Sequence, residues 1–203
     1  MLEVVNLSCT RGDRPLFRDL SFALKPGELL HLQGANGSGK TTLLRTLCGL
    51  SLPAAGEIRW HGKPVREDEA AFRAVLCYLG HHNALHGDLT GSENLYFETC
   101  LTDGPGNGQS ALNEIGLARV AGLPTKLLSQ GQKRRTALAR LLIQDKPLWV
   151  LDEPLTALDI RSTGIFLGLF SEHLARGGLI ILTSHQEVNL ADWPVLTVTL
   201  ENA

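Results

Sequence analysis

One stretch of the chain has the residue types and spacing of a phosphate-binding loop. It reads Gly-Ala-Asn-Gly-Ser-Gly-Lys-Thr from Gly34 to Thr41 and fits the pattern G-x-x-x-x-G-K-[ST]. Glycines let successive backbone N–H groups turn toward a phosphate, and the following helix adds the positive end of its dipole. Lys40 would neutralise β- and γ-phosphates, and Thr41 would hold Mg²⁺. The residues expected to bind nucleotide are Gly34, Ala35, Asn36, Gly37, Ser38, Gly39, Lys40, Thr41 and Thr42.

An acidic pair follows an apolar run later in the chain. Asp152 and Glu153 come directly after Leu148–Leu151, and ligands of open parallel sheets bind outside the carboxyl ends of the strands. Asp152 would reach the Mg²⁺, whereas Glu153 is placed to orient or deprotonate the water that attacks a γ-phosphate. Two solvated acids before a proline turn are the alternative, but a wholly apolar strand in front of them argues against it.

A third candidate site lies at the start of a long predicted helix. Ser129 and Gln132 are three residues apart, so they can form a reciprocal capping box, which is the structural explanation. The same helix start offers free N–H groups and a hydroxyl, and Gly131 permits a close approach, so it could also bind a phosphate. Because the chain already has one phosphate site, a second one makes sense if it completes the site of a neighbouring copy.

The apolar patterns predict an α/β fold that would position these residues. Short apolar runs bounded by turns or helical segments are typical of buried parallel strands. They are Leu29–Leu32, Val75–Leu79, Leu148–Leu151 and Leu179–Leu182, with a helix over about 163–174 between the last two. Segments with alternating apolar residues predict an antiparallel β-subdomain near the N-terminus. They are Leu2–Leu7, Phe17–Leu24 and a hairpin over 57–65.

Helical spacing dominates the region from about 81 to 144, which predicts a helical subdomain inserted in the core. The whole chain, 1–203, is expected to form one domain with a mixed, mostly parallel core sheet.

Composition excludes several classes of function. The 203 residues carry 19 Lys+Arg against 21 Asp+Glu, a net charge of -2, so no positive field attracts nucleic acid or lipid. The scattered cysteines form no C-x-x-C pair, which favours reduced core thiols over a zinc site. Since no apolar run approaches the ~18 residues that span a bilayer, we expect a cytosolic protein whose membrane role comes through partners.

Together these stretches resemble the nucleotide-binding domain of ABC ATPases. The matching motifs are Walker A at Gly34–Thr41, the signature at Leu128–Gln132, Walker B at Leu148–Glu153, the D-loop at Thr156–Asp159 and the switch histidine at Thr183–His185. The resemblance implies a head-to-tail homodimer with two ATP molecules between Walker A of one copy and the signature of the other. It also implies that His185 contacts the γ-phosphate and that Asp159 contacts the opposite copy.

The sequence departs from this family pattern in three places, one of which is Gln130 in place of a usual glycine of the signature. Where members commonly have an aromatic residue that stacks on adenine, this chain has Arg11, which could stack its guanidinium on the base or be a solvated turn residue. Where members have a glutamine near the Mg²⁺, this chain has His81 and His82. A neutral imidazole is a poorer Mg²⁺ ligand than an amide oxygen. An exposed polar loop is the favoured interpretation of these histidines.

Several stretches are also similar to the ATP-binding subunits of the haem export systems of bacterial cytochrome c maturation. They are 32–45, 56–60, 78–81 and 183–186. This resemblance implies a peripheral protein on the cytoplasmic face of the inner membrane with separate integral-membrane partners. The segment from Gly80 to Leu95 is expected to contact those partners. Leu85, Leu89 and Leu95 could supply apolar contacts there, although a place in the buried core is the default expectation for each of them. The alternatives are the ATPase subunit of another small ABC exporter and a soluble ABC-type ATPase that acts on nucleic acid or ribosomes. For nucleic acid, the only concentration of basic residues is 133–135 with Arg140. On a helix these residues are more simply a solvated face.

Overall fold

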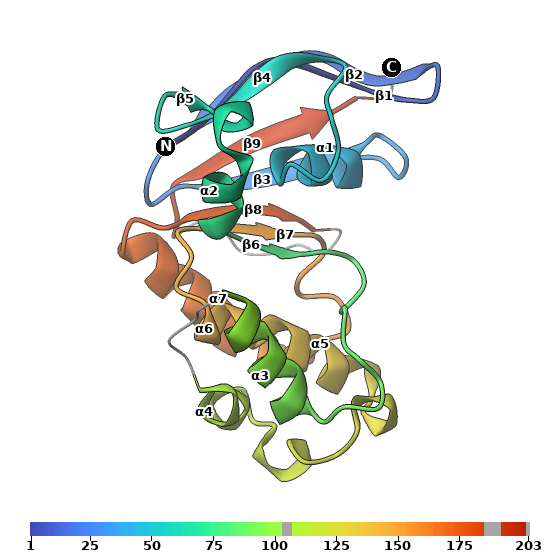
Figure 1. Cartoon of the computed structure of the whole chain (residues 1–203), viewed down its shortest axis with the longest axis vertical. Coiled ribbons are helices and arrows are strands. Elements are labelled where there is room, and N and C mark those ends of the chain that lie inside the picture. Colours follow the sequence, from blue (N-terminus) through green and yellow to red (C-terminus); the bar gives the residue numbers. More distant parts are fainter. Residues whose placement is uncertain (103–106, 185–191, 202–203) are drawn as a thin grey trace.

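The computed structural model describes residues 1–102, 107–184 and 192–201, and Figure 1 shows them as stacked layers. A four-stranded sheet has the order β2-β1-β4-β5, and a five-stranded core sheet has the order β6-β7-β8-β3-β9. The outer sheet consists of β1 (Leu2–Arg11), β2 (Arg14–Leu24), β4 (Ala55–Trp60) and β5 (Lys63–Pro64). The core sheet consists of β3 (Leu29–Gly34), β6 (Leu76–Leu79), β7 (Leu148–Leu151), β8 (Leu179–Thr183) and β9 (Val195–Leu200).

The helices lie on both faces of the core sheet (Figure 1). Two of the described helices lie between the core sheet and the outer sheet, namely α1 (Lys40–Leu47) and α2 (Glu69–Ala74). Five of the described helices lie on the opposite face of the core sheet. They are α3 (Gly91–Thr102), α4 (Gly108–Glu114), α5 (Gln130–Leu138), α6 (Arg140–Ile143) and α7 (Ile160–Ala175). Short 3₁₀ turns are η1 (Val65–Glu67), η2 (Ala118–Val120) and η3 (Thr125–Leu127). The long helix expected from Ser129 onward is in fact two helices, because α5 ends at Leu138 and α6 begins at Arg140.

The fold class is confirmed. The described strand pairs of the outer sheet are antiparallel, and those of the core sheet are parallel. Helices α3 to α6 lie in the sequence between β6 and β7, which is where the helical subdomain was expected. The single-domain organisation itself stays a prediction.

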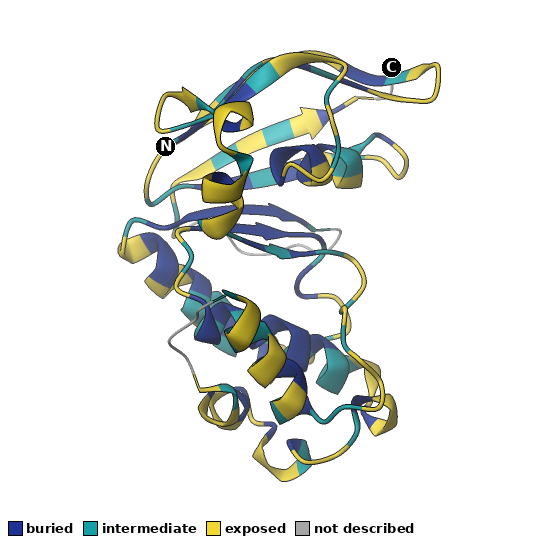
Figure 2. Cartoon of the chain, viewed as in Figure 1, coloured by how far each residue is buried: buried dark blue, intermediate teal, exposed yellow. Residues whose placement is uncertain are grey.

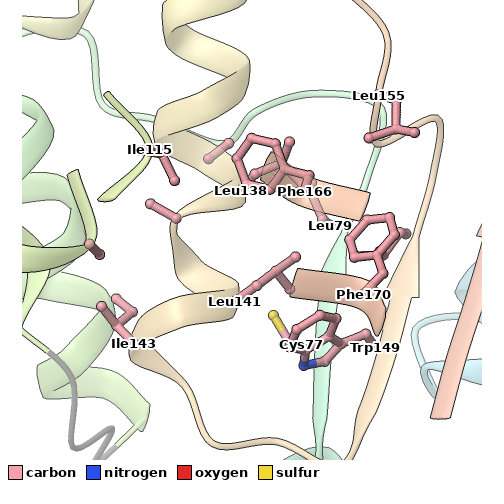
Figure 3. Close-up of a cluster of buried hydrophobic side chains, with 14 of the residues drawn as sticks. Cys77, Leu79, Ile115, Leu138, Leu141, Ile143, Trp149, Leu155, Phe166 and Phe170 are labelled. Atoms are coloured by element: carbon pink, nitrogen blue, oxygen red, sulfur yellow. The ribbon is translucent and has the colours of Figure 1, made fainter. Parts of the chain in front are cut away.

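The central strands of the core sheet supply side chains to two hydrophobic cores. In β7, Leu148 and Val150 pack into the core toward the outer sheet, whereas Trp149 and Leu151 pack toward the helices. Because successive side chains of a strand point to opposite faces, a strand that is covered on both sides must be apolar throughout. Figure 2 shows β7 buried along its length, and Figure 3 shows Trp149 beside Phe170 of α7.

A histidine completes the core on the helical side. The His173 ring of α7 stacks on Trp149 with ring centroids 3.7 Å apart and the ring planes 9° apart. Burial lowers the pKa of His173 to about 4, so the imidazole is neutral at neutral pH. Gly178 packs directly against this ring, and a Cβ atom at that position would collide with it.

We expect Gly178→Ala to lower the free energy of unfolding by about 2 kcal/mol, because the added methyl group overpacks the His173 ring. Gly168→Ala is the matched control. Gly168 lies on the exposed side of α7 with open space around it, so alanine there should stabilise the helix by up to about 1 kcal/mol. Urea unfolding of the two variants measures both effects, and equal stabilities would contradict the packing described here.

Candidate active site

The loop from Gly34 to Lys40 closes on itself around the lysine. The Lys40 ammonium donates hydrogen bonds to the carbonyl oxygens of Gly34, at 2.6 Å, and Ala35, at 3.1 Å. A Cβ atom on Gly34 would lie 2.6 Å from Ser38 Oγ and 2.7 Å from Leu200 O, so only glycine fits there. The backbone therefore wraps tightly and presents its first helical turn, at the start of α1, to a cavity.

Ser38 carries a buried hydroxyl group in the middle of the loop. Its side chain is 2% exposed, and its Oγ has no hydrogen-bond partner among the described residues. A buried hydroxyl without a partner costs free energy, so such a group calls for a ligand that can accept or donate a hydrogen bond. The orphaned hydroxyl beside Lys40 fits a bound phosphate.

The Asp152 carboxylate joins the ends of three structural elements. It accepts hydrogen bonds from Thr41 Oγ1 of α1, at 3.0 Å, and from Thr183 Oγ1 of β8, at 2.8 Å. Asp152 is 3% exposed, although a charged carboxylate prefers water. Carboxylate and hydroxyl oxygens are the ligands that Mg²⁺ prefers, so this pair fits the cation expected here.

Glu153 follows in a backbone conformation that is unusual for a residue with a side chain. Its φ is 51°, in the left-handed region, and its N–H donates to Thr183 Oγ1 at 2.9 Å. Strained residues of this kind persist where the surrounding structure fixes them, and they cluster at active sites. Thr183 thus holds both acids at once, with its hydroxyl hydrogen on Asp152 and its oxygen on the Glu153 amide.

These groups line one cavity of about 370 Å³. Its walls are Arg11, Leu16, Asn36, Gly37, Gly39, Lys40, Thr41, Thr42, His81, Asp152 and Glu153. The structure therefore brings together the loop, both acids and two of the positions at which the sequence departs from the family pattern. Arg11 and His81 are exposed side chains at this cavity, so each can reach a bound nucleotide.

The residues of the signature lie elsewhere. Ser129 and Gln132 form the reciprocal capping box at the start of α5, and α5 lies across the core sheet from α1 (Figure 1). Ser129, Gly131 and Gln132 do not line the cavity of their own chain. A Cβ atom on Gly131 would lie 2.8 Å from Ala157 O, so the glycine lets α5 pack closely on the segment before α7.

Asp159 caps α7 by accepting a hydrogen bond from the Ser162 N–H at 2.7 Å. This hydrogen bond lowers the pKa of the carboxyl group. Asp159 is likewise outside the cavity of its own chain, and His185 lies outside the described residues.

The expectation that the basic residues of α5 form a solvated face is wrong for Arg134. Its side chain is 5% exposed and donates hydrogen bonds to the carbonyl oxygens of Asp152, at 2.8 Å, and Glu153, at 2.7 Å. Arg140 likewise pairs with Glu98 at 2.9 Å. The physical reason is that the turn after β7 leaves its carbonyl groups pointing at α5, where only a long cation can satisfy several of them.

Sequence reasoning therefore missed two residues that build the site. Thr183 carried a usable signal, because a hydroxyl at the carboxyl end of an apolar strand must lie beside the similar end of β7. Arg134 carried none, since a charged helix residue usually faces solvent.

Comparison with known proteins agrees with this geometry. The model of the ABC transporter family matches residues 17–156. The chain belongs to the ABC transporter family of ATPases. A relative from Dechloromonas aromatica, named cytochrome c biogenesis ATP-binding export protein CcmA, is 52% identical over 94% of this chain and 95% of its own length.

Solved structures show the same fold. A chain from Pyrococcus furiosus named as an ABC transporter ATP-binding protein has a TM-score of 0.83 and 27% identity, and the match covers 98% of this chain and 96% of that one. An ATP-binding cassette solved as a post-hydrolysis dimer with ADP and phosphate has a TM-score of 0.85 and 22% identity. The match covers 100% of this chain and 96% of that one.

We expect Thr183→Val to lower the free energy of unfolding by about 2 to 3 kcal/mol, because it leaves Asp152 Oδ1 and the Glu153 N–H unpaired in a buried place. Thr183→Ser keeps the hydroxyl group and should cost only about 1 kcal/mol for the lost methyl group. Urea unfolding distinguishes the two variants. If valine were tolerated as well as serine, the hydroxyl would not hold the two acids.

Proposed function

We propose that this ABC ATPase binds and hydrolyses ATP at the cavity between α1 and the carboxyl end of β7. One observation carries the proposal: Thr41, Asp152, Thr183 and Glu153 form a continuous hydrogen-bonded chain beside the Lys40 loop. In this proposal the loop from Gly34 to Thr42 holds the phosphates. The orphaned Ser38 hydroxyl gains its partner there.

Each acid has a separate role in the proposal. Asp152 and Thr41 hold Mg²⁺, which when bound neutralises charge on the phosphates. Glu153 orients and deprotonates the attacking water, because it is the next residue along the same turn and lines the same cavity. His185 completes the contact with the γ-phosphate.

Two copies of the chain are proposed to share their nucleotide sites. Ser129, Gly131 and Gln132 at the capped start of α5 do not line the chain's own cavity, which supports contact with a nucleotide that another copy holds. Asp159 would contact the opposite copy beside them. A dimeric assembly of another cassette with this fold has been solved with ADP and phosphate bound.

We further propose that ATP hydrolysis powers an export step of cytochrome c biogenesis, with haem as cargo or as the group delivered. The relative named for this process supports the proposal by its 52% identity over nearly its whole length. Within the described residues no helix is long and apolar enough to cross a membrane. From the export process in that relative's name, we propose that separate integral-membrane subunits hold the protein at the cytoplasmic face of the inner membrane.

The surface for these partners is proposed to include one face of α3. Tyr96, Phe97 and Leu101 are 66%, 54% and 80% exposed. Large apolar side chains that gather on a protein surface mark a site of interaction with another protein. Leu95, by contrast, is fully buried, so it belongs to the core and cannot contact a partner. The alternative of a nucleic-acid ATPase loses support, since Arg134 and Arg140 are engaged within the chain.

We expect Glu153→Gln to lower the rate of ATP hydrolysis at least about 100-fold, because the amide cannot accept a proton. The variant should accumulate as an ATP-bound dimer, measured by light scattering with and without ATP. Lys40→Ala is the matched control, since it should lose nucleotide binding and stay monomeric. A Glu153→Gln protein that hydrolyses ATP at the wild-type rate would exclude Glu153 as the base.

We expect the Glu153→Gln protein, when purified from native membranes, to bring small haem-handling membrane subunits with it. Adding Phe97→Glu should abolish this co-purification, because a charge on the exposed face of α3 cannot enter an apolar interface. Adding Leu52→Glu is the matched control, since Leu52 is 81% exposed but lies away from α3. Mass spectrometry identifies the subunits. Their recovery with Phe97→Glu would move the contact surface elsewhere.

A further inference from the structure

The guanidinium group of Arg134 is buried with each of its five N–H groups paired. An arginine side chain has five N–H donors and no acceptor, so its capacity is fully used. The acceptors are four backbone carbonyls and one side-chain amide oxygen. Nε donates to Pro154 O at 3.0 Å. Nη1 donates to Gly80 O at 3.2 Å and to Asn83 Oδ1 at 3.1 Å. Nη2 donates to Asp152 O at 2.8 Å and to Glu153 O at 2.7 Å.

These bonds clamp the turn that carries Glu153. The Glu153 N–H is held by Thr183 Oγ1, and its C=O is held by Arg134. The left-handed backbone of Glu153 is thereby fixed from both sides, which it needs because a non-glycine residue pays for that conformation. Only a planar, forked cation can reach three consecutive carbonyls together, and a lysine ammonium cannot.

The charge of Arg134 is balanced without a direct ion pair. Burial lowers the pKa of its guanidinium, while the nearby charges of Asp152 and Glu153 raise it. Within the described residues no carboxylate oxygen lies at ion-pair distance from Arg134. Because carbonyl dipoles and acids beyond ion-pair distance offset only part of the cost of burying a charge, the group is better explained by the geometry that it imposes than by stability.

The same side chain links three segments that the proposed mechanism must coordinate. Arg134 lies on α5, whose first turn carries Ser129. Its partners include the turn after β7 and Gly80, and the residue after Gly80, His81, lines the nucleotide cavity. A shift of α5 would thus reach both Glu153 and His81 through one rigid group.

We propose that Arg134 is a positioning residue that holds Glu153 in the geometry for hydrolysis and ties that geometry to α5. The inference rests on the proposed function. When the Ser129 end of α5 engages the nucleotide of a neighbouring copy, Arg134 transmits its position to the turn of Glu153. We expect ATP binding to depend little on Arg134, since none of its five partners belongs to the Lys40 loop and its bond to Asp152 is made to the backbone carbonyl, not to the carboxylate proposed to hold Mg²⁺.

The test separates binding from turnover in Arg134→Gln and Arg134→Lys. We expect the Kd for ATP to stay within about threefold of wild type, since the loop is untouched, and kcat to fall about 100-fold, because a misplacement near 1 Å costs that much. Arg134→Lys should be nearly as slow as Arg134→Gln, since lysine keeps the positive charge but lacks the planar guanidinium group that reaches several carbonyl groups at once. Lys133→Gln is the matched control, and its kcat should match that of wild type.

Several results would overturn the inference. They are a wild-type kcat in Arg134→Gln, a Kd that rises as much as kcat falls, or full activity in Arg134→Lys. Thermal unfolding verifies that the variants fold. Should both be unfolded, Asn83→Ala decides, because it removes one acceptor from the loop side and should lower kcat about threefold to tenfold with the Kd unchanged. An unaltered kcat there would also refute the role.

The activities of the variants distinguish a failure of the proposed function from a failure of the positioning role. In that case Glu153→Gln would hydrolyse ATP as fast as wild type, whatever the Arg134 variants do. If Glu153→Gln is inactive and the Arg134 variants are not, the ATPase assignment stands and the positioning role falls.

Discussion

The structure depends on one buried carboxylate, that of Asp152. A charge that is 3% exposed at the end of an apolar strand must be satisfied in place, and the hydroxyl groups of Thr41 and Thr183 do so. This requirement draws α1, β7 and β8 to a common point, because each supplies one member of the network. The phosphate loop and the strand ends are thus held in register by polar contacts that water cannot replace.

The wall of the cavity has one closely packed part, the loop around Lys40, and one part made of exposed side chains. The loop is so closely wrapped that a methyl group on Gly34 would strike Ser38 and Leu200, yet Arg11 and His81 remain exposed at the cavity wall. The rigid part suits a phosphate chain, whose shape is the same in all nucleoside triphosphates. The exposed part holds Arg11 and His81, the two lining residues at which this chain departs from the pattern of its family.

Much of this could be predicted from the sequence, for identifiable reasons. Strand β7 and the first four residues of β8 are continuous apolar runs, so their burial and the position of the acids after β7 follow from local composition. The capping box of Ser129 and Gln132 is likewise a local pattern, and the structure confirms it. Arg134 could not be predicted, because its partners lie 18 to 54 residues away and are mainly backbone carbonyls, which leave no mark on residue identity. The break between α5 and α6 was missed for a similar reason, since no proline or glycine marks it.

The strands that serve two cores have a consequence for how the protein loses its structure. Trp149 and Ile180 contribute to the core on the helical side, while their sequence neighbours Val150 and Ile181 contribute to the other. Neither core can therefore melt while the other stays intact, because the backbone of the same strands would have to be ordered and disordered at once. We therefore expect the helical layer and the layer of the outer sheet to unfold together, so that a substitution that destabilises one core lowers the folded population of both.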